Sequence, residues 1–191
     1  MKPTLLFIAL LGCASAFADS SVPVVNNAVI SNAGVGYNGN MAVNQAAGDQ
    51  QQQANARAIA SGTQASATTH IKQVSKAVVD PVMNARSSIQ GNSFSNGNGA
   101  LGINQTAGAN NQQANAMRLT TSAQPLSVDD SALSQQNVAL ARGSDSAGSL
   151  GSRQVNTDDQ AFTGSRGLIQ LNQSAGVGNR MGNTLSVRVA D

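Results

Sequence analysis

The sequence has very few aromatic residues, one cysteine and one histidine. Its 191 residues include one Tyr, four Phe and no Trp. Only Tyr37, Phe94 and Phe162 lie beyond Ala18. Buried aromatic side chains usually dominate the energetics of a globular core, so their scarcity predicts that other interactions stabilise this fold.

Charge of either sign is also scarce. The chain has 11 Lys and Arg residues and 9 acidic residues, all of them Asp, so the formal net charge is +2. There is no basic stripe of the kind that nucleic-acid binding needs. Low charge, abundant Asn and Gln, and only four Pro are typical of segments that stack into cross-β structure, whereas disordered chains usually carry more net charge or more Pro.

The N-terminal segment 1–18 has the features of a secretory signal peptide. Lys2 precedes a short apolar run from Thr4 to Leu11, and Ala16-Phe17-Ala18 fits a cleavage site. The run is too short to span a bilayer, which needs about 20 apolar residues, and no second run of that length follows. A lipoprotein anchor at Cys13 is the alternative. With cleavage near Ala18, the mature chain has no cysteine and forms no disulfide.

Three segments of the chain align with one another without gaps. They are residues 39–59, 99–119 and 167–187, which we take as repeats 1, 2 and 3. The remaining segments are a lead-in (19–38), two linkers (60–98 and 120–166) and a tail (188–191). Six columns are identical in all three copies: Gly39/Gly99/Gly167, Asn44/Asn104/Asn172, Gln45/Gln105/Gln173, Ala47/Ala107/Ala175, Gly48/Gly108/Gly176 and Asn55/Asn115/Asn183.

Each repeat is predicted to be a strand, a turn and a second strand. Alternation in the first limb gives an apolar strip on one face, formed by Met41, Val43, Leu101, Ile103, Ile169 and Leu171. Turn residues Gly48, Gly108 and Gly176 follow it. The second limb of repeat 1 is compatible with a helix, but the matching stretch Thr184 to Val189 in repeat 3 favours a strand.

A single strand–turn–strand unit is marginally stable in water, and stacking three of them would bury a shared strip. We therefore predict an all-β, β-solenoid-like or cross-β array with irregular linkers. Equivalent amides would form hydrogen-bonded ladders, and open strand edges would recruit further chains. The predicted self-assembly ladder is Asn44, Gln45, Asn55, Asn104, Gln105, Asn115, Asn172, Gln173 and Asn183. For Asn44, Asn104 and Asn172, exposure to solvent is the alternative.

The linkers are compatible with disorder or with further strands. Val22 to Ile30 favour a strand before the first repeat. Residues 131–142 are compatible with a short helix between Asp130 and Gly143.

No residue pattern predicts catalysis, a cofactor or a metal. His70 has no second His or Cys with which to form a metal site. Asp129-Asp130 and Asp158-Asp159 lie in polar linkers, where solvated or capping roles are the usual ones. No G-x-S-x-G motif is present.

The stretches Val43 to Gly48 (VNQAAG), Gln52 to Ala56 (QQANA) and Ile103 to Ala116 (INQTAGANNQQANA) resemble the repeats of the Fap functional amyloids of Pseudomonas. The resemblance implies export across the outer membrane of a Gram-negative bacterium, an extracellular or cell-surface location, and a role in biofilm fibres. The implied partners are further copies or homologous fibre subunits and the outer-membrane export machinery. Repeat 3 departs from the pattern at Arg180 to Thr184, and the C-terminal cysteine pair of the main subunits is absent, which fits a minor subunit or paralogue. The alternatives are a monomeric β-solenoid adhesin and a periplasmic assembly factor.

Overall fold

The computed structural model describes residues 24–80, 82–123, 132–141 and 151–190. These residues form strands and no helix. The strands are β1 (Val24–Ser31), β2 (Asn38–Ala47), β3 (Gln52–Gly62), β4 (His70–Val79), β5 (Met83–Gln90), β6 (Asn98–Ala109), β7 (Gln112–Ser122), β8 (Ala132–Ala141), β9 (Arg153–Thr157), β10 (Arg166–Val177) and β11 (Arg180–Ala190). The predicted all-β class is confirmed.

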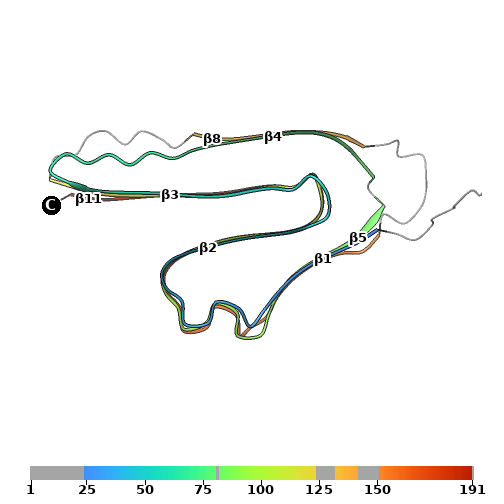
Figure 1. Cartoon of the computed structure of the whole chain (residues 1–191), viewed down its shortest axis with the longest axis horizontal. Coiled ribbons are helices and arrows are strands. Elements are labelled where there is room, and N and C mark those ends of the chain that lie inside the picture. The colour runs from blue at the N-terminus through green and yellow to red at the C-terminus, as the bar shows by residue number, and fades with distance from the viewer. Residues whose placement is uncertain (1–23, 81, 124–131, 142–150, 191) are drawn as a thin grey trace, which may run out of the picture.

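Every sheet is parallel and is built from strands that are far apart in the sequence. The strand orders are β1-β5-β9, β2-β6-β10, β3-β7-β11 and β4-β8. The register of the central two sheets is the one that the alignment gives: Gly39 pairs with Gly99 and Gly99 with Gly167, and Asn55 pairs with Asn115 and Asn115 with Asn183. Three stretches of chain therefore lie on one another, and their traces superimpose in Figure 1.

We call these stretches layer 1 (residues 24–80), layer 2 (the described residues of 83–141) and layer 3 (residues 153–190). Layer 2 lies between the other two, because its strands are central in the three-stranded sheets. Within a layer the chain follows a winding path from one sheet to the next (Figure 1). Layers 1 and 2 each supply four strands, while layer 3 supplies β9, β10 and β11 among the described residues.

The two strands of a strand–turn–strand unit do not form a hydrogen-bonded hairpin. β2 and β3 belong to different sheets, as do β6 and β7. They face each other through their side chains, while their backbone groups pair with the layers above or below. An isolated unit therefore has no backbone ladder of its own and depends on its neighbouring layers.

The prediction of irregular linkers was wrong for much of both segments. Residues 60–98 contain β4 and β5, and residues 120–166 contain β8 and β9. The short helix expected at 131–142 is instead strand β8, which pairs with β4 over ten residue pairs. Helix propensity is a weak prior, and a parallel partner strand overrides it here. The strand expected near Val22–Ile30 is β1.

The main apolar cluster lies between the sheet of β1 and the sheet of β2. Ile30, Ile89, Leu101 and Ile103 are buried there with Tyr37 and Phe94. The rings of Phe94 and Phe162 stack with their centroids 5.6 Å apart. The three aromatic residues beyond residue 18 thus converge on one cluster, where each fully buried large side chain contributes about 1.5–3 kcal/mol.

Candidate self-assembly site

Gln45, Gln105 and Gln173 form one continuous amide ladder across the three layers. Gln105 Nε2 donates to Gln45 Oε1 at 2.7 Å, and Gln173 Nε2 donates to Gln105 Oε1 at 2.8 Å. The ladder also bridges two sheets, because Gln105 Nε2 lies 3.1 Å from Ala28 O and 2.9 Å from Ser88 O. Gln105 is completely buried, so these contacts satisfy a polar group among apolar neighbours.

The Asn columns form a second, two-column ladder between β2-β6-β10 and β3-β7-β11. Along one column Asn104 donates to Asn44 and Asn172 donates to Asn104, both at 2.9 Å. Along the other, the equivalent distances from Asn115 to Asn55 and from Asn183 to Asn115 are 3.0 Å. Cross-links join the two columns within layers 1, 2 and 3 at 2.8, 3.1 and 3.0 Å.

The asparagines also hold the two limbs of each repeat together. Asn115 Nδ2 donates to Ile103 O at 3.0 Å in repeat 2, and Asn183 Nδ2 donates to Leu171 O at 3.1 Å in repeat 3. Asn104 is fully buried and Asn172 is 2% exposed, whereas Asn44 is exposed. The alternative in which this column faces solvent is therefore wrong for layers 2 and 3. Both faces of the first limb are used: one carries the Gln ladder and the apolar strip, the other the Asn ladder.

The apolar strip lies on the same face as the Gln ladder. Leu101 and Ile103 are buried, and Met41, Val43 and Leu171 pack against the same cluster. Ile169 differs, because 39% of its surface is exposed. It lies in layer 3, at the open edge of the sheet.

All three turn glycines have a backbone conformation that favours glycine, and Gly48 and Gly108 are required by sterics as well. Gly48, Gly108 and Gly176 have φ values of +98°, +121° and +123°. A Cβ atom on Gly48 would lie 1.9 Å from Gly108 O, and one on Gly108 would lie 1.9 Å from Gly176 O. Only glycine allows the backbones of successive layers to approach this closely at the turn.

Several ladder residues were missed by the sequence reasoning because their columns are not identical in all three copies. Gln113 donates to Gln105 O and Ser174 Oγ, both at 3.0 Å, but its counterpart in layer 3 is Met181. Asn111 continues a turn column: it receives a bond from Asn179 Nδ2 at 2.9 Å. Gln113 does belong to a QQANA run, the motif that carries the family resemblance, so this motif could have identified Gln113 as a ladder residue.

One cation is embedded in the ladder region of layer 1. Arg57 donates to Met41 O and, at 3.5 Å, to Asn40 Oδ1. Desolvation by burial lowers the pKa of Arg57 from its ordinary value. Its neighbours in the same column are Met117 in layer 2 and Leu185 in layer 3, so this column holds no second charge.

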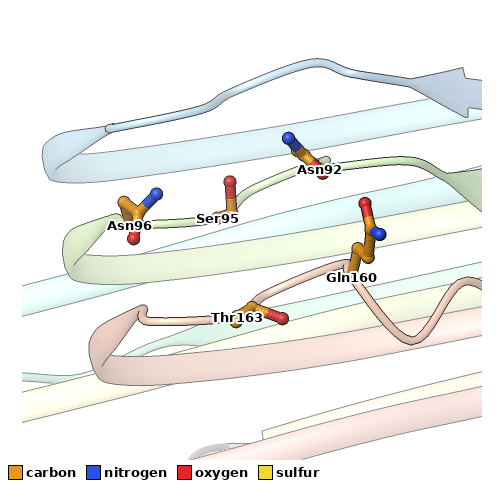
Figure 2. Close-up of a pocket in the computed structure, with 5 residues that line it drawn as sticks. All are labelled: Asn92, Ser95, Asn96, Gln160 and Thr163. Carbon is orange, nitrogen blue, oxygen red and sulfur yellow. The ribbon is translucent and has the colours of Figure 1, made fainter.

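The described residues line hollows on the surface, and one between β3 and β4 has a volume of about 640 Å³. Figure 2 shows a hollow of about 210 Å³ on the turns that follow β5 and β9, lined by Asn92, Ser95, Asn96, Gln160 and Thr163. None of these side chains is charged. No group of three His, Cys, Asp or Glu residues suited to a metal occurs in the described ranges.

The acidic pairs divide between described and undescribed parts of the chain. Asp158 has a structural role, because its Oδ2 accepts a bond from Gly91 N at 3.1 Å across layers. Asp129 and Asp130 lie outside the described residues, as do residues 1–18, which include Cys13. His70 is the first residue of β4, where it pairs with Ala132.

The part of the chain that the structure describes contains no helix long and apolar enough to cross a membrane.

The parallel, in-register strands and their amide ladders place the protein in the class of all-β proteins stabilised by stacked identical side chains.

The chain belongs to the functional amyloid protein FapB/FapC family, whose model matches residues 14–190. The resemblance inferred from the repeat motifs is thereby confirmed. The chain is similar to the functional amyloid subunit FapC of Pseudomonas aeruginosa, with 32% identity over 160 residues, which are 80% of this chain and 44% of that relative. The chain thus spans less than half the length of this relative. No solved structure matches it.

Proposed function

We propose that this protein is a secreted structural subunit that joins extracellular amyloid-like fibres, which support biofilm and adhesion. The observation that carries the proposal is the stack of parallel, in-register strands whose outer edges have no partner within the described chain. β1, β2 and β3 form one open edge, and β9, β10 and β11 form the other. Open edges with matching backbone groups recruit further strands.

The ladder residues named in the sequence analysis are the proposed self-assembly site, with residues 39–59, 99–119 and 167–187 as the stacking units of a β-solenoid-like array. The bonds from Gln105 and Asn104 support this role, because each is repeated from layer to layer. Amide ladders of this kind stabilise cross-β stacks. Membership of the family and similarity to FapC support the same function.

The proposal includes export with residues 1–18 as the signal peptide, and homologous subunits as partners. Expression of the full chain in a Gram-negative host that has the outer-membrane export machinery tests export: the expected result is extracellular protein that begins near Asp19. Retention of residues 1–18, or acylation of Cys13, would contradict cleavage after Ala18.

Fibre formation is tested by incubating residues 19–191 with thioflavin T and recording diffraction from aligned material. The expected result is dye-binding fibres with reflections at about 4.7 Å and about 10 Å. A chain that stays monomeric for days with no such reflections would favour the monomeric adhesin instead.

A further inference from the structure

We propose that copies of this chain join head to tail, so that layer 3 of one copy pairs in register with layer 1 of the next and Arg166 stacks on Asn38 of the neighbouring copy. This inference rests on the proposed fibre function. It adds the polarity and the register of the joint, which fibre formation alone does not define.

The first argument is that the three amide columns that are identical in all repeats have the same donor direction. Gln173 donates to Gln105, Asn172 to Asn104 and Asn183 to Asn115, and each amide of layer 2 donates in turn to layer 1. In these three columns donation runs from the later layer to the earlier one, whereas in the Gln53–Gln113 column Gln53 Nε2 donates to Gln113 Oε1 at 3.1 Å. A layer 1 amide placed against layer 3 of another copy would continue this direction.

The outer faces of layers 1 and 3 are complementary in their hydrogen-bonding groups, because one has an available amide donor and the other an available amide acceptor. Among the described contacts, Asn44 Nδ2 has no acceptor, while Asn172 Oδ1 receives a bond only from Asn183 Nδ2. A carbonyl oxygen accepts two hydrogen bonds. Asn44 of an incoming copy thus finds an acceptor at Asn172. In a joint between two layer 1 faces, amide donors would meet amide donors.

The second argument comes from the residue columns at the joint. Stacking layer 1 on layer 3 continues the identical Gly, Asn, Gln and Ala columns of the repeats without interruption. It also continues the apolar columns, because Met41 would meet Ile169 and Val43 would meet Leu171. Within one chain, Leu101 of layer 2 pairs with both Met41 and Ile169, and Ile103 pairs with both Val43 and Leu171. The partly exposed Ile169 would become covered.

The third argument is the placement of charge. The strands of layer 3 carry Arg153, Arg166, Arg180 and Arg188, whose columns in layer 1 hold Asn26, Asn38, Gln52 and Ala60. The layer 1 cation Arg57 would face Leu185. Head-to-tail stacking therefore places no charge on another charge, and like charges directly opposite each other destabilise a sheet. A joint between two layer 3 faces would instead bring two sets of four arginines together.

The column Asn38–Asn98–Arg166 gives a direct test, because Asn38, Asn98 and Arg166 are all exposed. Adjacent strands lie about 4.8 Å apart, so Asn38 and Arg166 of one chain are two spacings, about 9.6 Å, apart. At the proposed joint the same two positions are one spacing apart. A disulfide requires Cα atoms within about 4.4–6.8 Å, so it can form at the joint and not within the chain.

The experiment uses the full chain with Cys13→Ser and the pair Asn38→Cys and Arg166→Cys, assembled and then oxidised. The expected result is a series of covalent multimers on a non-reducing denaturing gel. The matched control, Asn38→Cys with Asn98→Cys, pairs adjacent layers of one chain and should give an internal disulfide of the same geometry. Each single-cysteine variant should remain monomeric on the gel.

The outcomes separate the two proposals. Fibres that form with the internal control disulfide but without 38–166 multimers overturn the head-to-tail register. Dimers from either single-cysteine variant overturn the polarity, because they report joints between like faces. Failure of the unsubstituted chain to form fibres contradicts the proposed function itself.

Discussion

Replacement of Gln105 by Ala is expected to destabilise the dilute, unassembled chain more than replacement of Gln45. The side chain of Gln105 has five polar partners, which are Gln45, Ala28, Ser88, Gln173 and Ser87. Three of them share the two hydrogens of Nε2, so about four full hydrogen bonds form at once. Gln45 makes two, to Val29 and Gln105. At about 1 kcal/mol for each bond, Gln105→Ala lowers the free energy of unfolding by about 4 kcal/mol and Gln45→Ala by about 2 kcal/mol.

Urea unfolding followed by circular dichroism measures this difference of about 2 kcal/mol. Gln45→Ala is the matched control, since it removes the same side chain from the same column. A difference below about 0.5 kcal/mol would refute the claim that burial in layer 2 makes the ladder stronger there. In assembled fibres every layer is an inner layer, so the two variants should then become equally unstable.

Three further predictions concern the turn, the joint and the core. Gly108→Ala should destabilise the chain by at least about 3 kcal/mol in urea unfolding, because its Cβ would lie 1.9 Å from a carbonyl oxygen. The control is Gly36→Ala, whose Cβ meets no atom within 4 Å and which should cost only about 1 kcal/mol of backbone strain. Equal effects of the two substitutions would contradict the stacked turn. Asn38→Lys should raise the monomer concentration in equilibrium with fibres about two- to fivefold, because it places a lysine opposite Arg166 at the joint, and the increase should be smaller at high salt. Arg166→Asn should remove this effect. If the effect of Asn38→Lys is unchanged by Arg166→Asn, positions 38 and 166 are not in contact. Phe94→Ala, which empties a fully buried site beside a stacked ring, should lower the unfolding free energy by about 3–5 kcal/mol, and a loss below about 1 kcal/mol would contradict that core.

The register of the central sheets could be predicted from the sequence because it depends on identical columns. A one-residue slip would move Gln105 and the apolar strip to the opposite face, so the gapless alignment of the repeats specifies the pairing strongly. The same alternation predicted which face of the first limb carries Leu101 and Ile103. These features are local, with period two, and can be read along the chain.

Other features could not be predicted because they depend on contacts across the stack. Strands β4 and β8 share few residue types at paired positions, as with His70 and Ala132 or Lys72 and Ser134, so no repeat was visible there. The sequence left two positions open for Asn104, in the ladder or in solvent, because a polar face looks solvated until a second polar face, that of β7, is placed against it. Gln113 was missed because its column changes to Met181 in layer 3.

The central claim is that each chain contributes three stacked layers to a fibre, and mass per length tests it most directly. Three spacings of about 4.8 Å advance a protofilament by about 14 Å for each chain. With a chain mass of 19.3 kDa, the account predicts about 13 kDa per nanometre of protofilament, or slightly less after removal of residues 1–18. A value of about 40 kDa per nanometre, which corresponds to one chain for each strand spacing, would contradict it.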